Sequence, residues 1–263
     1  MGADIGIYVF LILAGLCVGF LSGLLGLGGG IIMFPVLLYL PSALGLGEFD
    51  ISSITGLTMA QGFFSATSAM YFYHQQRLVN KALVWTLGVS LFISSMAGAL
   101  FSHDLQREPL MVVFGVLALA AALLMLLPRA YHRDEETEEG VSFNKPLAVG
   151  MGLVLGFFLG MIGQGGAFII IPVLLYVLRI PLRVALGSTL AIALLSSSAG
   201  FAGKALTGQV PLLPAIAILV STVPAARLGG VVGKRTEVRY LKWLLALVIS
   251  ASALKVWYDI LGR

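Results

Sequence analysis

Two glycine-rich links, residues 26–30 and 163–167, have the residue types and spacing best suited to binding chemistry. They lie in the stretches 19–39 and 156–176, which align without a gap at an offset of 137 and are identical at 12 of 21 positions. Each glycine disfavours a continuous helix by about 1 kcal/mol relative to alanine, so we expect a helix break at each link. A helix that begins at such a break has unpaired N–H groups and a partial positive charge, which suits an anion.

Polar side chains inside apolar segments form the second group of candidates. Gln61 lies midway along its segment, and Gln164 stands in the second glycine link; each amide can donate two N–H bonds. Hydroxyl groups in membrane helices more often bond their own helix or a neighbour, but they gain weight as part of a cluster. The candidate substrate-binding residues are Gly28, Gly29, Gly30, Thr58, Gln61, Gln164, Gly165, Gly166, Ser188, Thr189 and Arg227.

Several candidates have a second interpretation. Arg227 lies well inside an apolar segment, where its guanidinium could hold an oxyanion or could extend toward the cytoplasmic end near Lys234. Lys204 ends its segment and is expected to be an interface anchor. The glycines could also serve close helix packing, since Gly19 and Gly23 have the small-xxx-small spacing.

The composition places these residues in a membrane protein. Hydrophobic residues make up 59% of the 263 residues and charged residues only 11%, against about 25% charged in a soluble domain. A spanning helix needs about 20 apolar residues. The apolar segments are 5–25, 30–46, 51–73, 82–102, 109–128, 146–163, 167–179, 183–204, 211–233 and 239–261. The second and seventh are short and contain proline.

The ten segments divide into two halves. We expect a first membrane repeat at 1–128, a polar cytoplasmic linker at 129–145 and a second membrane repeat at 146–263. The similarity continues beyond the glycine links at an offset of 131. Five segments per half is an odd number, so the second repeat would cross the membrane inverted. The predicted fold is an all-α polytopic membrane protein of two inverted-topology repeats with Gly/Pro-broken or re-entrant helices.

Basic residues predict the orientation in the membrane. They gather in the links after the third, fifth, seventh and ninth segments, and the opposite links hold few. By the positive-inside rule, both termini face the periplasm or the cell exterior. The basic residues in question are Arg77, Lys81, Arg129, Arg133, Lys145, Arg179, Arg183, Lys234, Arg235, Arg239 and Lys242.

Other functions are disfavoured by what the segments lack. All twelve acidic residues lie in links or near segment ends, so no carboxylate is available at the expected midplane to couple sodium, protons or a metal ion. Cys17 is the single cysteine, and no pattern indicates a metal or another cofactor. No nucleophile or His/Asp/Glu cluster suggests an enzyme. The basic residues form no stripe for nucleic acid.

The doubled glycine motif ending in Pro-Val-Leu-Leu, followed by RVALGSTLA (183–191) and GKALTGQV (203–210), resembles the TauE/SafE sulfite-exporter family of membrane permeases. The resemblance covers nearly the whole chain apart from the linker. It implies transport of small sulfur-containing anions, such as sulfite, sulfoacetate or related organosulfur acids, across the bacterial inner membrane. Gln164 and Ala167 replace Leu27 and Gly30 of the first half, so the two halves are chemically unequal.

The sequence therefore predicts a multi-pass inner-membrane transporter that moves a small sulfur-containing anion by alternating access at the glycine breaks. A passive anion channel and a transporter of an unrelated small solute stay open as alternatives. The expected partners are the anionic substrate and the lipid bilayer, without nucleic acid, and a homodimer is left open.

Overall fold

The computed structural model describes residues 2–25, 29–73, 79–126, 143–164, 167–236 and 238–261, and these residues form helices and short links without a β-strand. The prediction of an all-α fold is confirmed. The elements are α1 (Gly2–Leu25), α2 (Gly30–Ala43), α3 (Ile51–Tyr73), α4 (Lys81–Leu83), the π-helical turn η2 (Val84–Gly88), α5 (Val89–Phe101), the 3-10 turn η3 (Ser102–Asp104), α6 (Arg107–Leu126), α7 (Lys145–Met161), α8 (Ala167–Pro172), the π-helical turn η5 (Val173–Val177), α9 (Leu182–Leu206), α10 (Leu212–Arg235) and α11 (Val238–Leu261).

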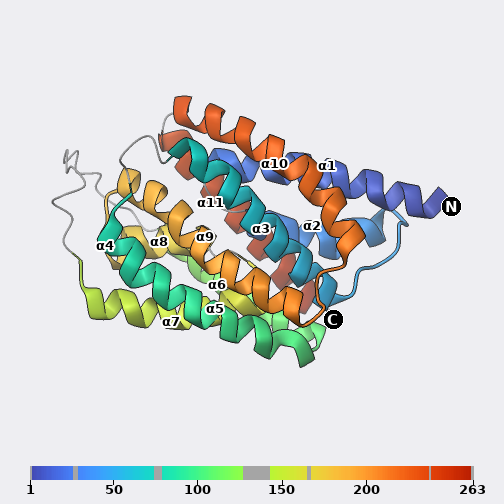
Figure 1. Ribbon diagram of the computed structural model, residues 1–263, viewed down its shortest axis with the longest axis horizontal. Helices are drawn as coiled ribbons and strands as arrows, with labels where there is room; N and C mark the ends of the chain where they lie inside the picture. Colours follow the sequence, from blue (N-terminus) through green and yellow to red (C-terminus); the bar gives the residue numbers. More distant parts are fainter. Residues whose placement is uncertain are drawn as a thin grey trace.

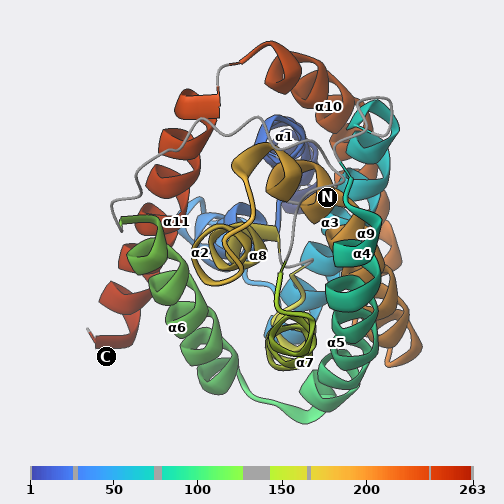
Figure 2. The same ribbon diagram turned by 90° about the vertical axis from the view of Figure 1, so that its left-hand side faces the viewer.

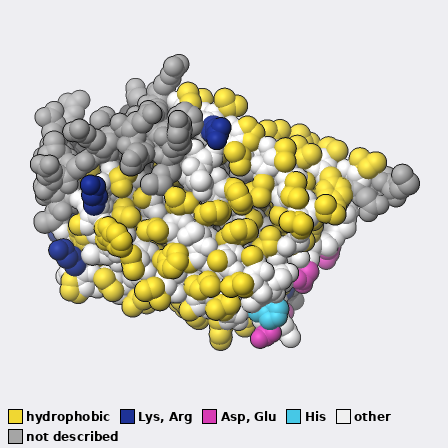
Figure 3. Space-filling model, viewed as in Figure 1, with side chains coloured by type: hydrophobic (Ala, Val, Ile, Leu, Met, Phe, Trp, Pro, Cys, Tyr) yellow, Lys and Arg dark blue, Asp and Glu magenta, His cyan; other side chains and the backbone are white. Residues whose placement is uncertain are grey.

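Among the described residues, five helical runs are long and apolar enough to cross a membrane. These runs are Ile5–Leu25, Lys81–Asp104, Arg107–Met125, Gly187–Leu206 and Leu212–Gly233. Figure 3 shows that one face of the molecule is largely apolar, with acidic and histidine side chains confined to one end and Lys and Arg in the other half. This surface suits contact with lipid.

Exposed aromatic residues near helix ends support the same conclusion. Trp85 is 73% exposed near the start of the α4–η2–α5 run, Trp243 is 68% exposed near the start of α11, and Tyr258 is 76% exposed near its end. Amphipathic rings gather where the hydrocarbon meets the polar head groups. The α11 helix thus has an exposed aromatic side chain near each end, as a membrane-crossing helix would.

The two halves of the chain are interlocked through glycines. Helix α1 packs along α10, and α7 packs along α5. A Cβ atom added at Gly23 would overlap the backbone of Ala226, and one at Gly160 would overlap the backbone of Ser95. Gly23 and Gly160 are 137 residues apart, and the residues that they contact, Ser95 and Ala226, are 131 residues apart. These are the two offsets of the sequence repeat. The first helix of each half therefore packs on the fourth segment of the other; inverted crossing of the membrane stays a prediction.

Helices α2 and α8 lie inside the bundle. Figure 2 shows both of them surrounded by the other helices, and Figure 1 places them in opposite halves of the long axis. Pro35 has no N–H to donate to the Ile31 carbonyl. The hydroxyl of Ser252 on α11 donates to that carbonyl instead, at 3.2 Å. Phe34 stacks on Phe114 of α6 with ring centroids 4.7 Å apart, so α2 is held from two sides.

The glycine interface gives a matched pair of substitutions on α7. Gly160→Ala should lower the stability by about 2 kcal/mol, because the added methyl group overlaps the Ser95 carbonyl and the two helices must separate. Gly150→Ala meets no atom within 4 Å and should change stability by no more than about 1 kcal/mol. Thermal unfolding of the purified variants in detergent measures both, and equal melting temperatures would contradict close packing at Gly160.

Candidate functional site

The site begins where α2 starts inside the bundle. Its N-cap, Gly29, has φ of 75°, and no side chain caps the first turn. A Cβ atom at Gly29 would lie 2.5 Å from Nε2 of Gln61, and one at Gly30 would lie 3.0 Å from Cβ and Cγ of Gln164. Only glycine permits this backbone conformation together with so close an approach. The two glutamines, from α3 and from the link before α8, therefore meet the first turn of α2.

Both glutamine side chains are completely buried and unpartnered. Gln61 and Gln164 are each 0% exposed. Neither amide nitrogen nor amide oxygen of either side chain has a hydrogen-bond partner in the described part of the chain. Such a group left unsatisfied costs about 1–3 kcal/mol, which is why nearly all buried polar groups are paired. Two adjacent exceptions in the interior indicate a place where a ligand completes the hydrogen bonds.

The arrangement favours a small oxyanion. Each amide can donate two N–H bonds, and the uncapped first turn of α2 adds backbone N–H groups and the positive end of the helix dipole. Among the described residues, no Asp or Glu is buried. The amide oxygens can also accept a hydrogen bond, so an oxyanion that keeps one proton would find a partner as well.

The three candidate hydroxyls already bond within the protein. Thr58 donates to the Ile54 carbonyl at 2.7 Å, and Thr189 donates to the Ala185 carbonyl at 2.5 Å. Ser188 accepts the backbone N–H of Asn80 at 3.0 Å. Each of these contacts holds a helix or a helix start in place. Thr58 precedes Gln61 by three residues on α3 and so shares its face.

Arg227 is not brought to the glutamines. Its side chain is exposed on α10, and the neighbouring Ala226 is the residue that packs against α1. The guanidinium thus stands outside the enclosed group. Three other expected site residues, Gly28, Gly165 and Gly166, lie outside the described residues.

Lys204 is not the interface anchor expected from the sequence, because its side chain is 0% exposed. Its ammonium group donates to Oγ1 of Thr55 at 2.9 Å, Oγ of Ser102 at 2.5 Å, the Met161 carbonyl at 3.1 Å and Oε1 of Gln209 at 2.8 Å. These oxygens replace water around the charge. All four partners are neutral oxygens, so hydrogen bonds rather than an ion pair hold the Lys204 side chain.

The Lys204 cluster also fixes the second glycine link. Met161 ends α7, and Gly163, with φ of 71°, lies so close to the Thr55 carbonyl that a Cβ atom would overlap it. Gln164 follows directly. The ammonium group therefore holds the segment that carries one of the two glutamines. One feature of the sequence could have indicated that Lys204 is buried: Gln209, its hydrogen-bond partner, is a polar residue only five positions later.

The chain matches the family described as sulfite exporter TauE/SafE over residues 11–256. It is 22% identical over 271 residues to the "Probable membrane transporter protein YunE" of Bacillus subtilis strain 168, covering 96% of this chain and 98% of that protein. A "Probable membrane transporter protein" of Haemophilus influenzae is 27% identical over 267 residues, covering 97% of this chain and 97% of that protein.

A "Probable membrane transporter protein" of Xylella fastidiosa strain 9a5c is 33% identical over 175 residues, covering 66% of this chain and 64% of that protein. No solved structure matches the chain. The family match includes both glycine links and nearly all of the helical bundle. This all-helical membrane protein belongs to the TauE/SafE sulfite exporter family of membrane permeases.

Proposed function

We propose that the protein carries a small sulfur-containing oxyanion, such as sulfite or an organosulfonate, across the inner membrane by alternating access. The anion binds between the first turn of α2 and the side chains of Gln61 and Gln164. The observation that carries this proposal is the pair of buried amides without hydrogen-bond partners. A transporter must release its cargo, and neutral amide donors bind an anion more weakly than a guanidinium fork does.

The electrostatics support an anion over a cation. The first turn of α2 offers the positive end of a helix dipole, and the ammonium group of Lys204 has no carboxylate among its partners. Charges interact more strongly in a low-dielectric interior than in water. A cation would meet an unfavourable potential at this position, whereas a small anion would be stabilised.

The arrangement of the half-helices supports a carrier. Gln61 is the eleventh of the 23 residues of α3, so the site lies midway between the two ends of the bundle. From there, α2 and α8 run toward opposite ends (Figure 1). Movement of one group of packed helices against another would open the site to one side at a time. With both termini outside, the Lys and Arg residues of Figure 3 would lie on the cytoplasmic half.

Replacing either glutamine should separate function from stability. In Gln61→Leu and Gln164→Leu, transport of the anion should fall by about 10- to 100-fold, because a hydrogen bond to a charged group contributes about 1.5–3 kcal/mol. The melting temperature should stay the same or rise, since each change removes an unsatisfied buried amide. Uptake into proteoliposomes and thermal unfolding without substrate measure the two effects.

Ser221→Ala is the matched control, because it removes a buried polar group at the α1–α10 interface, where its hydroxyl bonds the Ile218 carbonyl. Transport should persist in this variant. Full transport by both glutamine variants would exclude the site.

A separate exchange experiment distinguishes a carrier from a passive channel. In a carrier, an unlabelled internal pool of the anion accelerates the uptake of labelled anion, whereas a passive channel shows no such counterflow.

Lys204→Met should weaken both folding and anion binding. Its partners lose hydrogen bonds worth roughly 3 kcal/mol in total, and the link that carries Gln164 loses the side chain that holds it, which should reduce anion affinity by about tenfold. Ser102→Ala keeps the ammonium group and removes one acceptor, so it should lower stability alone. Calorimetric binding and thermal unfolding test this, and unchanged anion affinity in Lys204→Met would contradict a role of Lys204 in positioning Gln164.

A further inference from the structure

The buried side chain of Lys204 is a titratable group that the proposed anion site uses only to hold the second glycine link. It lies within the membrane-spanning run Gly187–Leu206 and is 0% exposed, and its four hydrogen-bond partners are neutral. Ionisable groups inside membrane proteins are rare and commonly belong to ion or proton pathways. The Lys204 cluster is therefore a candidate site for a proton.

The hydrogen bonds around Lys204 suit two protonation states. In the protonated state its N–H groups donate to the surrounding oxygens, and the Ser102 hydroxyl donates to the Ala99 carbonyl at 2.8 Å. A neutral amine has one N–H fewer and one lone pair, and a hydroxyl can turn to donate to that lone pair. If Ser102 turns, the Ala99 carbonyl still accepts from Nε2 of Gln209 at 3.5 Å. Release of the proton therefore needs the rotation of only one hydroxyl.

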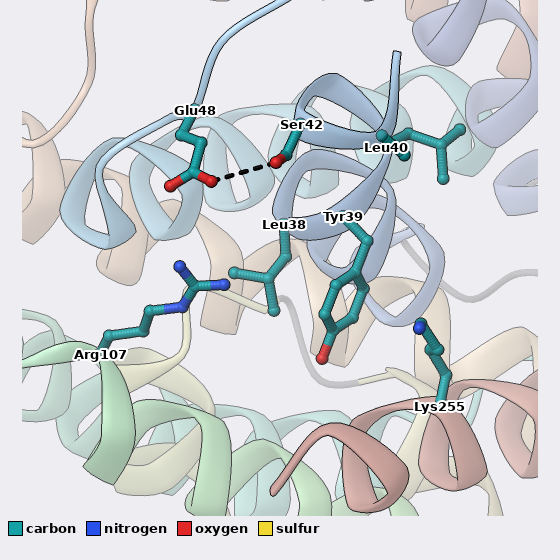
Figure 4. Close-up of a pocket in the computed structure, with 8 residues that line it drawn as sticks. Leu38, Tyr39, Leu40, Ser42, Glu48, Arg107 and Lys255 are labelled. Carbon is teal, nitrogen blue, oxygen red and sulfur yellow. Dashed lines mark hydrogen bonds between the residues drawn. The ribbon is translucent and has the colours of Figure 1, made fainter. Parts of the chain in front are cut away.

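The charged side chains of the elements around Lys204 do not reach it. Helices α3 and α5 contain no Asp, Glu, His, Lys or Arg, and α7 has only Lys145, at its opposite end. Arg107, at the start of α6, lines a separate pocket with Glu48 and the last turns of α2 (Figure 4). A proton on Lys204 is therefore not held by an ion pair. The other charged residues close to its partners along the chain are exposed, namely Asp50, His103 and Asp104.

The Lys204 cluster and the anion site share two structural elements. Thr55, a partner of Lys204, precedes Gln61 by six residues on α3, which is about 9 Å along a helix. The link after α7 joins the two sites again, because Met161 accepts from Lys204 and Gln164 follows three residues later. A positive charge on Lys204 would also favour an anion at this distance in a low-dielectric interior. Proton binding and anion binding can therefore influence each other.

The cluster exists at one end of the bundle only. At the repeat offset of 131, Lys204 and Gln209 correspond to Tyr73 and Leu78, so the first half lacks both groups. Ser102 and Gln209 lie in links that the charge pattern predicts on the outer side of the membrane. Ser102 is directly followed by His103, whose side chain is 50% exposed, so water lies close to the cluster along η3.

We propose that Lys204 binds the coupling proton of the transporter, an inference that rests on the proposed anion function. One proton from the external solution adds to the lone pair of Nζ as the anion binds at Gln61 and Gln164. The same proton is released to the cytoplasm after the anion leaves. Each ligand raises the affinity for the other, so the two move together as in a symporter. A monovalent anion and its proton form a neutral pair.

Proton binding is tested first without transport. The full-length protein in detergent is titrated between about pH 5 and 9, because a coupling group must release its proton near the pH of the cell. The unaltered protein should release one proton more per molecule than Lys204→Gln. Lys81→Gln removes an exposed lysine on α4 and should match the unaltered protein. Equal release by the unaltered protein and Lys204→Gln would overturn the proposal.

Coupling is tested in proteoliposomes with the membrane potential held at zero. The probe is methanesulfonate, which stays a monovalent anion over this range of pH. An outside solution more acidic by about one pH unit should drive about tenfold accumulation, because one proton enters with each anion. In Lys204→Gln the accumulation should disappear, whereas exchange of labelled for unlabelled anion should persist, since exchange needs no release of the proton. Both measurements at saturating anion compensate for any loss of affinity.

Gln209→Glu separates proton binding from a structural role. The new carboxylate replaces the amide whose Oε1 accepts from Nζ, so it should hold Lys204 in the protonated state. The melting temperature should stay the same or rise, exchange should persist, and accumulation should fall to that of Lys204→Gln. A lysine that serves packing alone would leave the accumulation of Gln209→Glu intact.

The outcomes separate this inference from the proposed function. If the unaltered protein exchanges no anion, the proposed function fails and the coupling fails with it. If it exchanges the anion but the pH gradient drives no accumulation, only the coupling fails. Accumulation that survives in Lys204→Gln or in Gln209→Glu would overturn the role of Lys204. If Lys204→Gln loses exchange as well, the titration and Gln209→Glu decide.

Discussion

Polar groups inside a membrane protein need hydrogen-bond partners that neither water nor lipid can supply, and the centre of this bundle depends on that constraint. Helix α2 starts there at Gly29, with its first turn uncapped, and the amides of Gln61 and Gln164 lie against it without partners. The surrounding helices are packed closely enough to keep all of these groups from exposure. The proposed anion would supply the hydrogen-bond partners that these groups lack.

Lys204 is also a buried polar side chain, but unlike the two glutamines it finds all of its hydrogen-bond partners within the protein. Four neutral oxygens from four segments surround its side-chain nitrogen, so this polar group is satisfied inside the bundle without a carboxylate. The cluster keeps the second glycine link in place. One buried lysine thereby positions the segment that carries Gln164.

Local features of the sequence were sufficient to predict the helices and to single out the two amides that lie buried against the start of α2. Apolar runs marked the helices because length and hydropathy are local properties, and Gln61 and Gln164 stood out as amides among apolar residues. The burial of Lys204 could not be predicted, because it depends on oxygens distant in the sequence, such as that of Thr55. The direction of Arg227 depended on which face of α10 meets α1, and successive helical residues point about 100° apart.

The exchange of first helices between the two halves has a consequence for biogenesis. Helix α1 leaves the ribosome well before its main packing partner, α10, which begins at Leu212. At about 5–20 residues per second, synthesis leaves α1 without that partner for roughly 10–40 s. The glycine face of α1 must remain in lipid or against a chaperone during this interval. The bundle can close only after nearly the whole chain has been inserted, so a truncated product would lack the α1–α10 interface altogether.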